Sequence, residues 1–291
     1  MCGFLVFYPL NKNSNFSQKK FNQASKLISH RGPDDKHEFF NEDVKMIFYR
    51  LNIIDLSLNG RQPMVSSSGK NLIVFNGEIY NANKLRKKLD KKIFLKGKSD
   101  TEVLLNLYEK YGNKILNQLE GMFSFLIFNF ETKKCFIARD RFGIKPLYFS
   151  KQKNYIIFSS EVKPILHYTQ KADFNYSAFA KFFFKQEMDN QDTFFNEIES
   201  LKPSTYKIIS KSRIHEFSYW NIEKNFKRKN FLNTQIHYEE ILKSSIKKHL
   251  TSDRKIGLLL SSGTDSTALA YFMSKNLNYR LKTFTYDFSN E

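Results

Sequence analysis

Residues 1–7 read MCGFLVF, and they carry the strongest indication of the fold class. A cysteine at position 2 is followed by a glycine and then by an unbroken apolar run, the pattern of a strand buried deep in a sheet. Removal of Met1 before a small residue leaves Cys2 with a thiol and a free α-amine on one residue. The α-amine has an ordinary pKa of about 8 and can accept the proton of a thiol whose pKa is about 8.5. The sequence therefore predicts an N-terminal cysteine nucleophile that needs no histidine.

The first 220 residues mix strand and helix signals. Apolar, β-branched or aromatic runs bounded by turn residues predict strands, and apolar residues at helical spacing predict helices. The expected strands are 4–8, 44–54, 72–76, 123–129, 134–138, 155–159 and several within 191–220, and the expected helices are 16–29, 82–89, 101–111 and 174–190. This mixture is typical of a layered α+β fold.

Composition narrows the classes of function. The 291 residues are 41% apolar, enough for a sizeable core. No apolar run reaches the roughly 20 residues of a membrane-spanning helix. The net charge of +18 is spread along the chain without an aromatic-interleaved arginine cluster, so we expect a solvated surface and no nucleic-acid face. Only Cys2 and Cys135 are present, and no secretory signal is readable, so we expect reduced thiols and a cytoplasmic protein.

Six motifs follow one another along the first 150 residues. They are CGF at 2–4, HRGPD at 30–34, RLNIID at 50–55, NGEIYN at 76–81, SDTE at 99–102 and ARDRFGIKPLY at 138–148. In this order they closely resemble the class II glutamine amidotransferase domain of glutamine-hydrolysing asparagine synthetases, and the resemblance extends to residue 220. It implies an N-terminal-nucleophile hydrolase fold, a four-layer sandwich in which two antiparallel sheets lie between layers of helices.

The resemblance also implies a glutaminase site. Cys2 would attack the carboxamide carbon of glutamine to give a thioester and ammonia, while the Asn76 amide and the Gly77 backbone N–H stabilise the oxyanion. Arg50 would bind the α-carboxylate through its planar fork. The other residues implied to bind glutamine are Leu51, Asn52, Ile53, Ile54, Glu78 and Asp100, of which the last two hold the α-ammonium.

Each of these residues also has an ordinary structural interpretation. Asn76-Gly77 is a common turn pair, Arg50 can be a surface cation, and Asp100 can belong to a helix cap. Their joint occurrence behind Cys2 favours the functional interpretation. His30 is interpreted as a buried, hydrogen-bonded imidazole rather than a base.

A second motif lies at residues 258–268, LLLSSGTDSTA. A short strand, a small-residue turn and a helix start place backbone N–H groups where an anion binds. Behind a glutaminase domain, the motif resembles the pyrophosphate loop of asparagine synthetases, usually SGGxDS, with Ser262 in place of the first glycine. The resemblance implies an ATP site made of Leu260, Ser261, Gly263, Asp265, Ser266 and Tyr286, with Asp265 facing Mg²⁺.

The composition changes near residue 220. We expect a glutaminase domain over 1–220, a linker over 221–233, and the N-terminal part of an α/β nucleotide-binding domain over 234–291. This last domain is expected to be incomplete, because the synthetase domain of the family continues beyond that length.

The resemblance implies glutamine, aspartate and ATP as substrates, with aspartate activated as β-aspartyl-AMP, and it allows a homodimer. Three alternatives stay open. They are a related ligase that amidates a sugar or peptide carboxylate, a truncated chain that retains only its glutaminase activity, and a catalytically idle regulatory protein.

Overall fold

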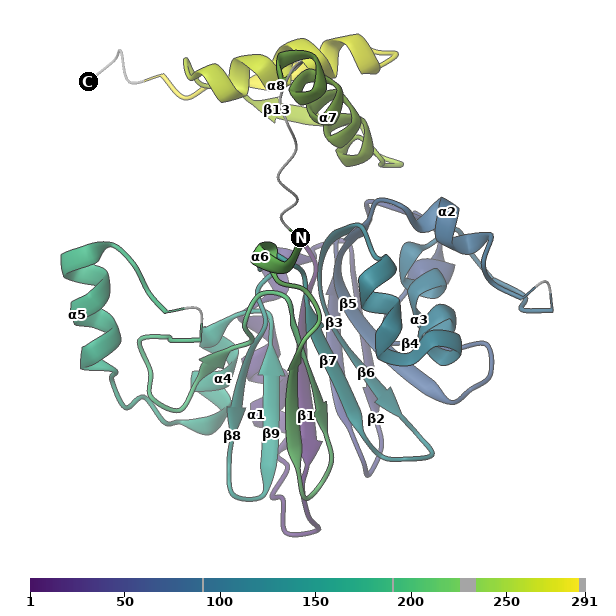
Figure 1. Ribbon diagram of the computed structural model, residues 1–291. Helices are drawn as coiled ribbons and strands as arrows, with labels where there is room; N and C mark the ends of the chain where they lie inside the picture. The colour runs from purple at the N-terminus through teal and green to yellow at the C-terminus, as the bar shows by residue number, and fades with distance from the viewer. Residues whose placement is uncertain (91, 190, 226–233, 288–291) are drawn as a thin grey trace. The chain divides into compact units, whose positions relative to one another are not determined.

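The computed structural model describes residues 1–90, 92–189, 191–225 and 234–287 (Figure 1). The chain forms two compact units, one over Met1–Asn225 and one after it. The predicted linker at 221–233 falls partly on residues 226–233, which lie outside the described residues, and begins with the short helix α6 (Ile222–Asn225).

Two six-stranded antiparallel sheets form the centre of the first unit. Their strand orders are β10-β8-β9-β1-β3-β2 and β12-β11-β7-β6-β5-β4. The strands are β1 (Gly3–Pro9), β2 (Asp35–Phe40), β3 (Lys45–Arg50), β4 (Met64–Val65), β5 (Asn71–Ile79), β6 (Gly121–Asn129), β7 (Cys135–Arg139), β8 (Tyr148–Lys151), β9 (Tyr155–Ser159), β10 (Glu199–Ser200), β11 (Thr205–Ile209) and β12 (Ile214–Ser218).

Strand β1 shows why the opening stretch is apolar throughout. It lies inside its sheet between β9 and β3, and all of its residues are buried. Phe4 and Val6 face the second sheet in the central core, whereas Leu5 and Phe7 face the helices on the other side. A strand covered on both faces needs apolar residues at successive positions.

Helices cover the outer face of each sheet. Helices α1 (Gln18–Lys26) and α4 (Val162–Thr169) pack on the sheet that contains β1, and α2 (Ala82–Arg86) and α3 (Asp100–Tyr111) pack on the other. Buried apolar clusters lie between the sheets and beneath each helical layer. The predicted four-layer α+β sandwich is therefore confirmed.

The second unit contains a strand–helix–strand element. Strands β13 (Gly257–Leu259) and β14 (Lys282–Phe284) run parallel, joined through α8 (Thr264–Asn276), and α7 (Thr234–His249) packs against α8. Its small core includes Ile246, Leu258 and Met273. Among the residues described in either unit, no helix is long and apolar enough to cross a membrane.

Several predicted boundaries need correction. The strand expected over 44–54 stops at Arg50, because the residues after it leave the sheet and bend into a loop. The helix expected over 16–29 ends at Lys26, and a 3₁₀ turn over Ser29–Arg31 follows. The sequence patterns did not predict β2, an edge strand whose first four residues are polar and whose last two, Phe39 and Phe40, are half-buried.

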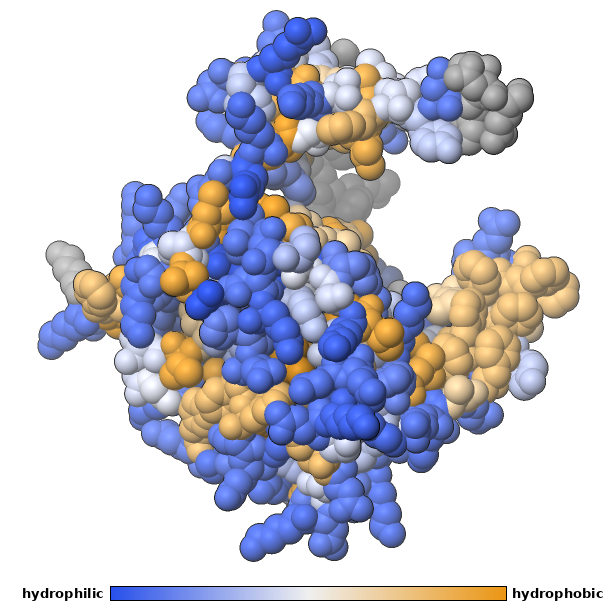
Figure 2. All heavy atoms as spheres, turned by 180° about the vertical axis from the view of Figure 1, so that it is seen from behind, coloured by the Kyte–Doolittle hydropathy of each residue, from blue (hydrophilic) through white to orange (hydrophobic). Residues whose placement is uncertain are grey.

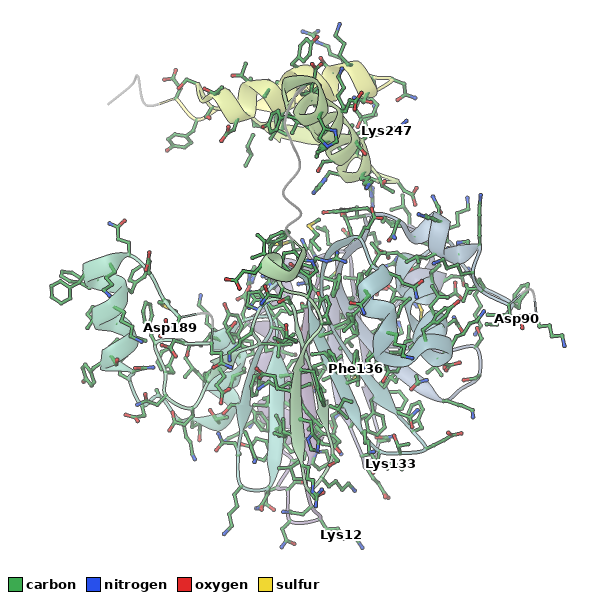
Figure 3. All side chains as sticks on the ribbon, in the orientation of Figure 1. Lys12, Asp90, Lys133, Phe136, Asp189 and Lys247 are labelled. Atoms are coloured by element: carbon green, nitrogen blue, oxygen red, sulfur yellow. The ribbon has the colours of Figure 1, made fainter. Side chains whose placement is uncertain are left out.

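The surface carries exposed lysine side chains, as expected from the composition. Lys12 and Lys133 project from the first unit and Lys247 from α7, whereas Phe136 of β7 lies in the interior (Figure 3). The exception is α5 (Tyr176–Lys185), within the helix expected over 174–190. It exposes an apolar patch (Figure 2) made of Tyr176, Phe179, Phe182, Phe183 and Phe184.

Candidate active site

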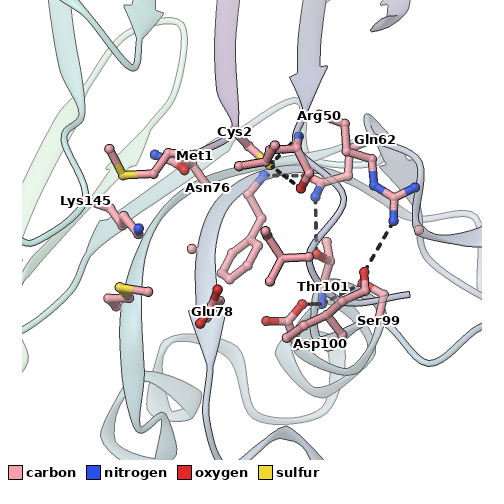
Figure 4. A pocket seen from close by; sticks show the side chains of 17 residues that line it. Met1, Cys2, Arg50, Gln62, Asn76, Glu78, Ser99, Asp100, Thr101 and Lys145 are labelled. Carbon is pink, nitrogen blue, oxygen red and sulfur yellow. Dashed lines mark hydrogen bonds between the residues drawn. The ribbon is translucent and has the colours of Figure 1, made fainter. Parts of the chain in front are cut away.

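A pocket of about 230 Å³ lies in the first unit where β1 begins (Figure 4). Its walls come from the start of β1, the end of β3 and its following loop, the centre of β5, the start of α3 and the loop after β7. The residues that line it are Met1, Cys2, Arg50, Leu51, Ile53, Ile54, Gly60, Gln62, Phe75, Asn76, Gly77, Glu78, Ser99, Asp100, Thr101, Met122 and Lys145.

Cys2 lies at the head of β1, facing this pocket. Its Sγ accepts the N–H of Leu51 at 3.4 Å, and its carbonyl accepts Nε–H of Arg31 at 3.0 Å. Burial raises the pKa of the thiol, and burial lowers the pKa of the α-amine at Met1. A thiol that keeps its proton needs a general base, and the α-amine of Cys2 becomes available for this role once Met1 is removed.

Asn76 presents a buried donor to the pocket. The residue is 1% exposed, and its Nδ2 has no hydrogen-bond partner within the described part of the chain. A buried donor without a partner is costly and calls for an explanation. An oxyanion formed by attack of Cys2 is an acceptor that would satisfy it.

The backbone N–H of Gly77 points to the same pocket. On either side of it along β5, the N–H of Phe75 donates to Gln62 Oε1 at 2.6 Å and the N–H of Ile79 donates to Asp100 Oδ2 at 2.9 Å. Alternate residues of a strand direct their N–H groups to the same edge, so the N–H of Gly77 lies between these two. Glycine is required there because a Cβ would overlap the carbonyl of Met122.

Arg50 closes the pocket on the side of the loop after β3. Its Nη1 donates to the carbonyl of Ser57 at 2.9 Å, and its Nη2 donates to the carbonyls of Ile54 and Asp55. Gly60 lies so close that a Cβ would overlap Nη2. A guanidinium carries five N–H donors. Three of the five N–H groups of Arg50 are used in these contacts. The other two have no partner among the described residues and can bind a ligand.

Two carboxylates lie on the opposite side of the pocket from Arg50 (Figure 4). Asp100 at the start of α3 accepts the N–H groups of Ile79 and Thr101 at 2.9 and 2.8 Å. Burial raises the pKa of Asp100 to about 6 and that of Glu78 to about 7. Cation on one wall and carboxylates on the other match the two charged ends of a free amino acid.

The structure places nearly all of the predicted glutaminase residues together. The pocket lining includes Cys2, Arg50, Leu51, Ile53, Ile54, Asn76, Gly77, Glu78 and Asp100. Asn52 is the exception, since it does not line the pocket and its N–H donates to Asp34 Oδ2 at 2.7 Å. The interpretation of His30 as buried is wrong. Its side chain is 62% exposed, with Nε2 2.9 Å from Glu161 Oε1.

Sequence reasoning missed several polar residues of the pocket, among them Gln62 and Lys145. Gln62 joins two walls, because its Oε1 accepts the N–H of Phe75 and its Nε2 donates to Thr101 Oγ1 at 3.2 Å. Lys145 lies beside Met1 in the wall opposite the loop after β3. Lys145 belongs to the motif at 138–148, which was the one signal that could have found it.

The residues predicted to bind ATP lie at the carboxyl ends of β13 and β14. The N–H of Leu260 donates to the carbonyl of Phe284 at 2.8 Å, which holds the two strand ends together. Ser261 and Ser266 close the turn before α8, with their Oγ atoms 3.0 Å apart. Tyr286, two residues after β14, is 80% exposed. Ligands of open α/β sheets bind at this edge.

The donor set here fits a magnesium nucleotide better than a free ion. Asp265 lies in the first turn of α8, after Gly263, whose N–H donates to Ser261 Oγ at 3.2 Å. Within the described ranges, no group of three or more His, Cys, Asp or Glu side chains could hold a metal. Mg²⁺ bound through phosphate oxygens needs only one or two protein carboxylates.

Known proteins match both units of the chain. A family described as a glutamine amidotransferase domain matches residues 1–220, and one described as asparagine synthase matches residues 237–291. In Bacillus subtilis (strain 168), the chain is 35% identical over 273 residues to "Asparagine synthetase [glutamine-hydrolyzing] 2" and 32% identical over 302 residues to "Asparagine synthetase [glutamine-hydrolyzing] 1". These alignments cover 89% and 100% of this chain but 36% and 46% of the relatives. The chain thus spans less than half of their length.

A solved structure resembles the fold. Glutamine phosphoribosylpyrophosphate amidotransferase from B. subtilis, complexed with ADP and GMP, aligns with a TM-score of 0.50 and 15% identity, covering 98% of this chain and 65% of that one. At this identity the likeness concerns the fold alone, and it agrees with the N-terminal-nucleophile hydrolase arrangement of the two sheets.

Proposed function

Because residues 1–220 show that the chain belongs to the glutamine amidotransferase family, we propose that it hydrolyses the side-chain amide of glutamine with Cys2 as the nucleophile. The observation that carries the proposal is the arrangement around Cys2. The Asn76 amide, whose Nδ2 has no hydrogen-bond partner among the residues that the structure describes, and the N–H of Gly77 share one pocket with a thiol at the chain start.

The geometry suggests a sequence of steps. With Met1 removed, the α-amine of Cys2 takes the thiol proton, and the thiolate attacks the carboxamide carbon. The Asn76 amide and the Gly77 N–H donate to the oxyanion. The carbon–nitrogen bond then breaks, the leaving nitrogen takes the proton back from the amine, and ammonia departs. Water, deprotonated by the same amine, hydrolyses the thioester to give glutamate and free thiol.

Substrate orientation follows from the charges of the pocket. Arg50 holds the α-carboxylate with the donors that its loop contacts leave over, and Glu78 and Asp100 hold the α-ammonium. The side-chain amide then extends toward Cys2. Asn52 lies in the same loop but does not line the pocket, and its N–H donates to Asp34.

In a protein of the relatives' length, the ammonia is used to amidate aspartate at the expense of ATP. The match of residues 237–291 to the asparagine synthase family supports this part of the proposal. The turn at Ser261 and Ser266 would hold the nucleotide phosphates, Asp265 would face Mg²⁺, and Tyr286 would lie near the base. The same proposal places the protein in a reducing compartment such as the cytoplasm, because the chemistry needs a free thiol. It also includes assembly as a homodimer.

The test is glutamate release from glutamine by the purified chain after mass spectrometry has confirmed the loss of Met1. Cys2→Ala should abolish release, because the covalent path is lost, while leaving the thermal unfolding temperature unchanged. Cys135→Ala is the matched control, since Cys135 is the buried thiol of β7 and should leave glutamate release intact. Undiminished release by Cys2→Ala would refute the proposal.

A further inference from the structure

Lys145 is a buried lysine that the steps above do not use. It lies in the loop between β7 and β8 and is 6% exposed. Its main chain is fixed at both ends, because its N–H donates to Asp140 Oδ2 at 3.0 Å and its carbonyl accepts Nε–H of Arg139 at 2.8 Å. A lysine is rarely buried unless its charge is balanced by a partner.

The opposite charge that acts most strongly on Lys145 is Glu78, on the neighbouring wall of the same pocket (Figure 4). The charged groups that face Glu78 are the Lys145 ammonium, the Asp100 carboxylate from α3 and the α-amine at the chain start. Those that face Lys145 are Glu78, Arg31 from the 3₁₀ turn, Cys2 from β1 and Asp140. Each member of the Lys145–Glu78 pair has the other as its strongest charge interaction.

Two carboxylates in one small pocket oppose each other's ionisation. Burial and then Asp100 raise the pKa of Glu78, Lys145 and the α-amine at the chain start lower it, and the net value is about 7. A carboxyl that is protonated at neutral pH cannot attract an ammonium ion. With Lys145 and Arg50 as cations and Glu78 and Asp100 as anions, the pocket is balanced and receives a zwitterion without a net charge.

We propose that Lys145 is a positioning residue of the glutaminase site, whose ammonium keeps the Glu78 carboxylate ionised so that the pocket binds the α-ammonium of its substrate at neutral pH. The inference rests on the proposed function for its substrate. It concerns binding rather than bond cleavage, so its signature is a pH-dependent KM.

The decisive variant is Lys145→Met, which keeps the length of the side chain and removes the charge. At pH 7 we expect the KM for glutamine to rise about fivefold relative to the parent, because a rise of about one unit from a pKa of about 7 lowers the ionised fraction of Glu78 by that factor, and we expect kcat to stay within about twofold. At pH 8.5 the ratio of the two KM values should shrink, because Glu78 ionises again without help. Lys145→Arg should restore the KM, and Lys153→Met, at an exposed lysine in the turn before β9, should change neither constant.

A second measurement does not depend on activity. The side-chain carboxyl of Glu78 can be titrated by ¹³C NMR, with its signal identified by its loss in Glu78→Gln, and Lys145→Met should move its midpoint upward by about one pH unit. An unchanged midpoint, or a KM ratio that is the same at both pH values, would overturn the inference. If the parent chain releases no glutamate, the proposed function fails, and the titration still decides whether Lys145 controls Glu78.

Discussion

Replacing Asn76 by alanine should separate activity from stability. The side-chain amide supplies one of the two oxyanion donors, so kcat should fall by about 10²–10³, equivalent to about 2.7–4 kcal/mol, with KM changed less than about threefold. Because Nδ2 lacks a partner among the described residues, its burial costs about 1–3 kcal/mol, and truncation removes that cost while losing the packing of a few atoms. We therefore expect the free energy of unfolding to stay within about 1 kcal/mol of the parent or to rise.

Asn71 on the same strand is the matched control. It is also buried, but its Nδ2 donates to Glu109 Oε1 at 2.9 Å and its Oδ1 accepts Nδ2–H of Asn129 at 2.9 Å, far along β5 from the pocket. Asn71→Ala should lose about 1–3 kcal/mol of stability and keep its kcat. Steady-state kinetics and denaturant unfolding of both variants check the reasoning. A kcat for Asn76→Ala within tenfold of the parent, or a stability loss as large as that of Asn71→Ala, would refute it.

Two further predictions concern the charged walls of the pocket. Arg50→Lys keeps the charge but loses the planar fork that holds the carbonyls of Ile54 and Ser57. In steady-state assays kcat/KM for glutamine should fall by a factor equivalent to about 1–3 kcal/mol of transition-state stabilisation. Unchanged kinetics would place Arg50 outside the binding site. For Asp100 the folded-state pKa of about 6 lies above its ordinary value of 3.8, so the parent loses stability as pH rises through this interval. Asp100→Asn replaces one of the two acceptor oxygens with a donor and should lose some stability for that reason at every pH, but its unfolding temperature relative to that of the parent should be higher at pH 8 than at pH 4. A difference of equal size at both pH values would contradict the linkage.

Sequence patterns predicted the buried strands of the fold better than its edge strands. Buried strands such as β9 need apolar residues on both faces, and that demand is visible in the sequence. The edge strand β2 is under a weaker demand of this kind, and its four polar residues, 35–38, resemble a loop. Helix α3 was found because Ser99 caps it by accepting the N–H of Thr101, a local signal.

The residues of the candidate site were predicted from their motifs, and the structure brings most of them into one pocket, while their roles stay predictions. His30 and Asn52 were misplaced because exposure and orientation depend on distant partners, here Glu161 and Asp34. Lys145 was overlooked for the same reason. Its neighbours in sequence suggest a turn, and only the fold brings it next to Glu78.

The inner position of β1 has a consequence for how the protein matures. The strand begins at Gly3 and is paired on both sides, so the residue that must become the new N-terminus is one position away from the sheet. In the folded chain Met1 is 56% exposed and also lines the pocket, so a retained methionine occupies space beside Cys2. A molecule that keeps its initiator methionine holds its α-amine one residue away from the thiol that this amine has to deprotonate. An affinity tag fused ahead of Met1 would trap the protein in that immature form.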